Sequence, residues 1–166
     1  MVETEPEQVV GATIEQTFYS VAGSEKLAML LYLIKNEPFE RMIIFGNRKD
    51  KNLDVFDALK KCNIAVELMS GDIAQQKRMR ILEDFRSGKI KIVIATDVAA
   101  RGIHVDNVSL VVNYDLPERS EDYVHRIGRT GRANRKGISY TLVQRKDKNR
   151  LYEIMRYTKV KMQPIK

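Results

Sequence analysis

The densest group of chemically active side chains lies within eight residues, 125–132, which read His-Arg-Ile-Gly-Arg-Thr-Gly-Arg. Each guanidinium is a planar fork that can donate to two phosphate oxygens at once, and the glycines let the backbone turn tightly. This octet predicts a phosphate-binding loop. The alternative is a solvated basic loop that closes a helix, with Gly128 and Gly131 as caps.

A second group follows the apolar run 92–95 and contains Thr96, Asp97, Arg101 and Gly102. A hydroxyl and free amides at a strand end can bind a nucleic-acid phosphate, and a glycine lets backbone approach a ligand. The segment therefore predicts a second phosphate contact. A simpler interpretation, in which Thr96 or Asp97 only caps a helix, is equally open.

A third group begins with Ser70-Gly71-Asp72 and continues with Gln75 and Arg78. Residues three apart lie on one helical face, and the amino end of a helix favours anions. A backbone phosphate could dock there. Taken alone, an ordinary capped amphipathic helix is the better interpretation.

Short apolar runs alternate along the chain with longer amphipathic stretches, a pattern typical of strand–helix–strand units and a parallel sheet. The predicted strands are residues 13–21, 41–45, 64–69, 91–95, 109–113 and 138–143. The predicted helices are residues 25–35, 51–61, 73–86 and 121–127, with Ser24, Asp50, Asp72 and Ser120 as N-caps. Consecutive apolar residues in 92–95 and 110–112 predict strands covered on both faces. Ligands in such a sheet gather at the carboxyl ends of the strands, and three polar segments follow predicted strand ends: Gly46-Asn47-Arg48, Ser70-Gly71-Asp72 and Thr96-Asp97.

The composition predicts one domain that attracts polyanions. The chain has 166 residues and a formal charge of +7. This charge alone does not decide whether the partner is RNA, DNA or not a nucleic acid at all. One cysteine, Cys62, and two histidines offer neither a disulfide nor a zinc site, so we expect Cys62 to be a buried or half-buried thiol.

Without a signal peptide or a long apolar segment, a cytoplasmic location is expected, with no membrane partner. Residues 1–13 are polar and predict a linker or arm before a domain of residues 14–166.

Taken in their order along the chain, and after the run Ile43-Ile44-Phe45, the three groups resemble the motifs of the C-terminal domain of DEAD-box RNA helicases. The octet matches the family motif without a substitution, and Asn113-Tyr114-Asp115-Leu116-Pro117 is equally typical. The resemblance covers residues 14–157. Within the family it is greatest to bacterial RhlB-type helicases, on 71–75 and 101–104. It implies a RecA-like three-layer α/β/α sandwich with a mainly parallel central sheet.

The resemblance also implies a role for each matching residue. Arg129 and Arg132 correspond to arginine fingers that act in ATP hydrolysis, and they would bind ATP together with Gly102 and His104, of which His104 replaces an aspartate that contacts the ribose. The residues of the interdomain face would be Asp97, Arg101, His125 and Arg126. RNA-backbone contacts, insensitive to base sequence, would come from Asn47, Gly71, Gln75, Arg78 and Thr96.

The sequence lacks the phosphate-cradling G-x-x-x-x-G-K-[ST] loop and the Asp-Glu-Ala-Asp segment that the family carries on its first domain. The resemblance thus implies that ATP and Mg²⁺ are used by a complete enzyme, with Mg²⁺ held by the first domain. RNA, that N-terminal RecA-like domain and an RNA-degradation complex would be the partners, and this domain alone would be inactive as an ATPase. A docking module and half of a DNA helicase are the alternatives, whereas no G-x-G-x-x-G follows the first strand as a dehydrogenase would require.

Overall fold

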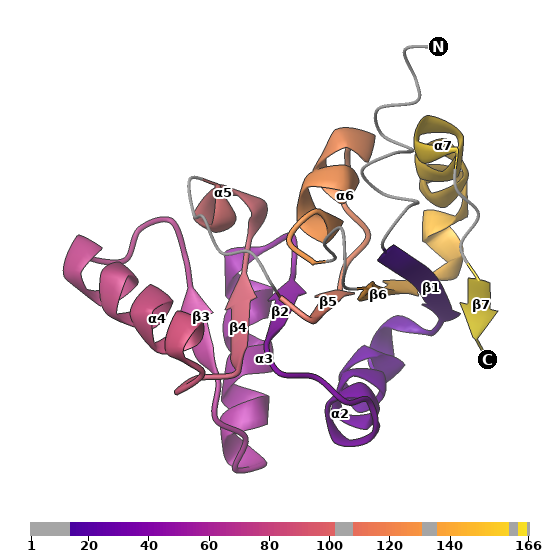
Figure 1. The fold of residues 1–166 in the computed structure, drawn as a ribbon. Helices are drawn as coiled ribbons and strands as arrows, with labels where there is room; N and C mark the ends of the chain where they lie inside the picture. Colours follow the sequence, from indigo (N-terminus) through magenta and orange to yellow (C-terminus); the bar gives the residue numbers. More distant parts are fainter. Residues whose placement is uncertain (1–13, 102–107, 131–135, 160–162, 166) are drawn as a thin grey trace.

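The sheet has seven strands, all parallel, in the computed structural model, which describes residues 14–101, 108–130, 136–159 and 163–165 (Figure 1). The spatial order is β3-β4-β2-β5-β6-β1-β7. The strands are β1 (Ile14–Ser20), β2 (Met42–Phe45), β3 (Glu67–Met69), β4 (Ile92–Ala95), β5 (Leu110–Asn113), β6 (Gly137–Val143) and β7 (Gln163–Ile165). The six predicted strands are confirmed, whereas β7 was not predicted. Strand β3 is shorter than predicted, because its pairing with β4 begins only at Glu67.

Helices cover both faces of the sheet. Helices α2 (Lys26–Asn36) and α3 (Lys49–Lys61) pack on one face. Helices α4 (Gln75–Ser87), α5 (Asp97–Ala100), α6 (Ser120–Ile127) and α7 (Lys148–Thr158) pack on the other. Short 3-10 turns, η1 (Gly23–Glu25) and η2 (Arg145–Asp147), precede α2 and α7. The sequence interpretation did not include α7.

The three-layer sandwich follows from the alternation of side chains along each strand. In β2, Ile43 and Phe45 join the core beneath α4 and α6, while Met42 and Ile44 join the core beneath α2 and α3. All four residues of β2, β4 and β5 are buried, as the consecutive apolar runs predicted. The predicted RecA-like architecture is confirmed.

The predicted N-caps of the four helices are wrong. Those helices begin after Glu25, Arg48, Ala74 and Arg119, and none of these N-cap side chains makes a capping hydrogen bond. The carboxylate of Asp72 accepts instead from Ser70 Oγ at 2.7 Å and from Lys49 Nζ at 2.9 Å. Thr96 does act as a cap, because its Oγ1 accepts from the Ala99 amide at 3.2 Å.

Three smaller expectations concern Cys62, the N-terminal residues 1–13 and membrane-spanning segments. Cys62 is exposed just after α3, so its predicted burial is wrong. The predicted arm, residues 1–13, lies outside the described residues. Among the helices that the structure describes, none is long and apolar enough to span a membrane.

Candidate functional site

The predicted site residues gather at the carboxyl edge of the sheet. Asn47 follows β2, Gly71 follows β3, and Thr96 and Asp97 follow β4. Since neighbouring parallel strands end at the same edge, residues far apart in the sequence become neighbours there. The structure thus brings the second and third groups of the sequence together.

The side chain of Arg126 lies at the centre of this edge. It comes from α6 and is fully buried. Its Nε and Nη2 donate to the two carboxylate oxygens of Asp97 at 2.7 and 2.8 Å. Its Nη1 donates to Asn113 Oδ1 at 3.2 Å and to the Asp115 carbonyl at 2.8 Å.

Two further contacts complete the surroundings of this guanidinium. Nη2 also donates to Asn47 Oδ1 at 2.6 Å, and the guanidinium lies 5.2 Å from the ring centroid of Phe45. A charge can be buried at acceptable cost only when it is paired and its donors are satisfied, and Arg126 meets both conditions. One side chain therefore ties together the ends of β2, β4 and β5.

A second ion pair adjoins this network. Lys26, the first residue of α2, donates to Asp115 Oδ1 at 2.8 Å, and only 8% of the Lys26 side chain is exposed. Asp115 Oδ2 accepts from the backbone amide of Asn47 at 2.9 Å, and Asn47 Nδ2 donates to the Leu116 carbonyl at 3.0 Å. Both ends of the Asn47 amide group are thus engaged within the domain.

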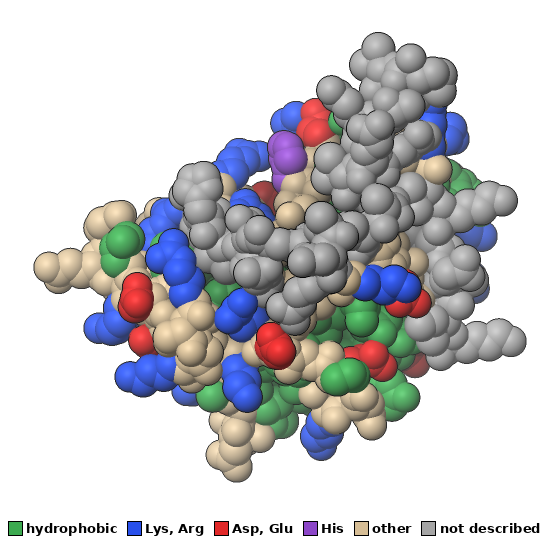
Figure 2. Space-filling view, in the orientation of Figure 1, with side chains coloured by type: hydrophobic (Ala, Val, Ile, Leu, Met, Phe, Trp, Pro, Cys, Tyr) green, Lys and Arg blue, Asp and Glu red, His purple; other side chains and the backbone are tan. Residues whose placement is uncertain are grey.

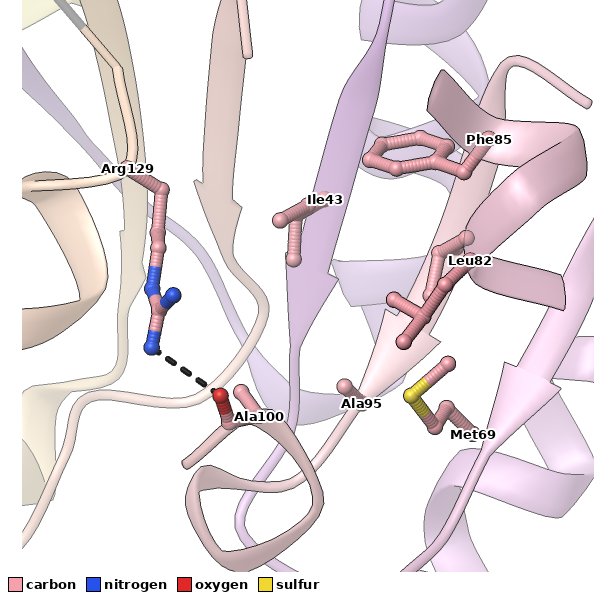
Figure 3. Close-up of a pocket in the computed structure, with 8 residues that line it drawn as sticks. Ile43, Met69, Leu82, Phe85, Ala95, Ala100 and Arg129 are labelled. Atoms are coloured by element: carbon pink, nitrogen blue, oxygen red, sulfur yellow. Dashed lines mark hydrogen bonds between the residues drawn. The ribbon is translucent and has the colours of Figure 1, made fainter. Parts of the chain in front are cut away.

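Arg129 lies beside a different part of the same edge, where its Nη2 donates to the carbonyl of Ala100 at 3.0 Å (Figure 3). An apolar cavity of about 20 Å³, which includes Met69, Leu82 and Phe85 in its lining, separates α4 from the sheet next to Arg129. This volume has room for about one water molecule. The cavity is too small and too apolar to hold a nucleotide.

Arg129 also lines a larger hollow of about 180 Å³. Its lining includes the cations Arg101, Arg126 and Arg129, together with His125, which is exposed. Two carboxylates, Asp97 and Asp122, also line it, but each already faces an arginine, Asp97 at 2.7 Å from Arg126 and Asp122 at 3.5 Å from Arg101. The lining thus carries one more cation than carboxylates, and this excess positive charge suits an anion such as a phosphate.

The RNA side of the predicted site lies around the amino end of α4. Gly71 is exposed, and a Cβ added there would lie 3.4 Å from Val98 Cγ1. Gln75 is the first residue of α4, and Arg78 Nη2 donates to the Arg101 carbonyl at 3.2 Å. Hydrogen bonds from Ser70 and Lys49 lower the pKa of the Asp72 carboxyl to about 2. Lys and Arg side chains outnumber Asp and Glu over the α4 side of the molecule in Figure 2.

Three predicted site residues, Gly102, His104 and Arg132, lie outside the described residues. Three residues that the sequence interpretation gave no role, Lys26, Asn113 and Asp115, prove to be central to the network. The positions of Asn113 and Asp115 could have been predicted from the sequence. Both follow the apolar run 110–112, and polar residues at the end of such a run lie at the edge of the sheet where ligands bind. Lys26 gave no signal, since its partner Asp115 is distant in the sequence.

Comparisons with known proteins settle the family. Residues 25–134 match the helicase conserved C-terminal domain. The chain belongs to this family. ATP-dependent RNA helicase RhlB of Pseudomonas aeruginosa (strain UCBPP-PA14) is 50% identical over 147 residues, which are 89% of this chain and 37% of the relative. The chain thus spans little more than a third of the length of that relative.

Solved structures agree with the family. The C-terminal domain of the DEAD-box protein Dbp5 has a TM-score of 0.87 and 34% identity, covering 94% of this chain and 92% of that one. Dbp5 of S. cerevisiae bound to RNA and ADP BeF3 has a TM-score of 0.82 and 33% identity, covering 91% and 41%. The predicted resemblance to the C-terminal domain of DEAD-box helicases, and to RhlB within them, is confirmed.

Proposed function

We propose that this helicase C-terminal domain is the second RecA-like domain of an ATP-dependent RNA helicase and supplies arginine fingers to ATP hydrolysis. The observation that carries the proposal is the position of Arg129, which lines a cation-rich hollow at the edge of the sheet that also carries the RNA-side residues. One domain edge would then contact both nucleotide and RNA. A relative, Dbp5 of S. cerevisiae, has been solved bound to RNA and ADP BeF3 together.

On the nucleotide side, Arg129 and Arg132 would neutralise charge that develops on the γ-phosphate, with Gly102 and His104 beside the nucleotide. ATP, when bound, supplies the phosphoryl group that is transferred to water. Exposed His125 and Arg101 would contact the first domain. Arg126 and Asp97 would act on that interface from within, because the Arg126 side chain is fully buried.

On the RNA side, Gly71, Arg78 and Thr96 would bind successive phosphates and riboses, and Gln75 would support Arg78. Asn47 would also contact RNA, and its hydrogen bonds with Arg126 and the Leu116 carbonyl would hold its amide group in place, since each uses only one of the two donor or acceptor sites at that end. Contacts of this kind would not select bases.

The remaining parts of the proposal concern the whole protein. Residues 1–13 would link this domain to the N-terminal RecA-like domain, which would hold Mg²⁺. The isolated domain would lack ATPase activity. A cytoplasmic location and association with an RNA-degradation complex remain predictions.

The test is RNA-stimulated ATP turnover by the enzyme that contains both RecA-like domains. Arg129→Ala should lower turnover by roughly 10³-fold or more, the scale of an arginine finger. Arg156→Ala, which removes an exposed arginine on α7, is the matched control and should retain turnover. Unchanged turnover in Arg129→Ala would leave a docking module as the better interpretation. Equal stimulation by DNA of the same sequence would favour a DNA helicase.

A further inference from the structure

A second hollow, of about 650 Å³, opens at the carboxyl edge of the sheet between the segments that follow β2, β5 and β6. Five cations line it, Lys26, Arg48, Lys51, Lys146 and Arg150, against three carboxylates, Asp115, Glu118 and Asp147. No role in the proposed function involves Lys51, Lys146 or Arg150. The hollow is concave, polar and basic, and it adjoins the proposed RNA side through Asn47 and Arg48.

Most of its carboxylate charge is already engaged. Asp115 pairs with Lys26 at 2.8 Å and also accepts from the Asn47 amide. Asp147, which is buried, accepts from the Gln144 amide at 2.9 Å and has Arg150 at 3.9 Å. The third carboxylate of the lining, Glu118, forms no ion pair within the described residues.

The cations are less fully engaged. Arg48 pairs with Asp50 at 2.9 Å, but both side chains are about two-thirds exposed, so this pair is weak and easily exchanged. Lys51 and Lys146 are exposed, and neither has an ion-pair partner among the residues that the structure describes. The hollow therefore has positive charge available to a ligand.

We infer that this hollow binds phosphates of the same RNA strand beyond the nucleotides held by Gly71, Arg78 and Thr96. The inference rests on the proposed function, and it extends the RNA track to Lys51 and Lys146. Lysine ammonium groups attract phosphates as point charges without fixed geometry, so the extension adds affinity and no base selection.

The experiment measures binding of fluorescent oligouridylates to this chain by anisotropy over a range of salt concentrations. Lys51→Gln with Lys146→Gln should weaken binding of a decauridylate by about tenfold at low salt, because two phosphate contacts are lost. The slope of log affinity against log salt should become shallower by about 1.4, or about 0.7 for each contact. A tetrauridylate, too short to occupy both sites at once, should change by less than about twofold.

The matched control is Lys35→Gln with Lys91→Gln. This variant removes the same charge, but Lys35 lies in the last turn of α2 and Lys91 precedes β4, so both lie at the opposite, amino edge of the sheet. The control should bind both oligonucleotides with the slope of the unmodified chain. If the two double variants behave alike, the hollow has no specific part in RNA binding and the inference fails.

Arg78→Gln separates this inference from the proposed function. Weaker binding of both oligonucleotides by Arg78→Gln, with no effect of the Lys51 and Lys146 changes, would refute the hollow alone. No effect of Arg78→Gln on either would refute the proposed RNA side. A labelled decaglutamate that binds more tightly than the decauridylate, with the same dependence on Lys51 and Lys146, would assign the hollow to an acidic peptide and overturn the inference.

Discussion

Arg126 and Asp97 are joined by two parallel hydrogen bonds, at 2.7 and 2.8 Å, across 29 residues of sequence. The Arg126 side chain is fully buried, whereas a quarter of the Asp97 side chain is exposed. The pair joins the octet, which begins in the last turn of α6, to the segment after β4, so two groups that were separate in the sequence form one structural unit.

Replacement of Arg126 should therefore be costly. Arg126→Gln leaves Asp97, Asn113 and Asn47 without their common donor, and removal of one partner from a buried pair costs about 3–5 kcal/mol of unfolding free energy. Urea denaturation measures this change. Arg48→Gln breaks an exposed pair and should cost less than about 1 kcal/mol. Equal losses in the two variants would show that burial of the Arg126 pair has no energetic consequence.

Gly46 should tolerate no side chain while Asn52 is present. A Cβ at Gly46 would lie 1.9 Å from Asn52 Oδ1, and Asn52 is 2% exposed, so its amide group cannot move freely. Gly46→Ala should lower the unfolding free energy by about 1–3 kcal/mol, the usual cost of overpacking. In a double-mutant cycle, Asn52→Ala should recover part of this loss. Strict additivity of the two changes would exclude the clash as the cause.

Four tyrosines should lose their protons at higher pH in the folded chain than in the unfolded chain. Burial raises the pKa of Tyr114 to about 12, and it also raises the pKa values of Tyr19, Tyr123 and Tyr140. The tyrosinate absorbance of these four residues should therefore appear at higher pH in the folded chain than in denaturant, where their burial is lost.

The same shifts have a consequence for stability. A raised pKa in the folded state means that the unfolded chain loses the proton first, near the ordinary value of about 10. The stabilisation is complete below that pH and is lost as the pH rises through about 12. Unfolding free energy measured at increasing alkaline pH should fall in this interval, and a constant value would contradict the prediction.

Thr96 should have a stabilising role apart from any contact with RNA. Its hydroxyl caps α5, and Thr96→Ala should lower the unfolding free energy by about 1 kcal/mol. Thr96→Ser keeps the oxygen and should retain most of that stability. Thermal or urea denaturation of the two variants measures the contrast, and identical stabilities would show that the hydrogen bond to Ala99 contributes nothing.

The sequence predicts the sheet well because its signals are local. Each of the residues 92–95 is apolar, and such a run predicts a strand covered on both faces without reference to the rest of the sequence. The octet is equally visible, since its chemistry depends on spacing within a few residues. Family, fold and the approximate position of the site could all be predicted from these features.

The network around Arg126 could not be predicted in the same way. Its contacts with Asn47, Asp97 and Asn113 exist only because β2, β4 and β5 are neighbours in the sheet, and strand order is not a local property. The N-cap errors have a similar origin. A carboxylate such as Asp72 had the right position in the sequence, but Ser70 and Lys49 engage it in the folded chain.

The position of β6 between β5 and β1 affects how the polypeptide can be made. The family match covers residues 25–134, yet β1 and β6 lie outside that range. A fragment cut at those limits would leave β5 as an unpaired edge, which invites aggregation. During synthesis, β1 is made well before its partner β6, so at roughly 5–20 residues per second it stays without β6 for on the order of ten seconds. Synonymous codons that slow translation between β1 and β6 should lengthen that exposure and reduce soluble yield without any change in the finished domain.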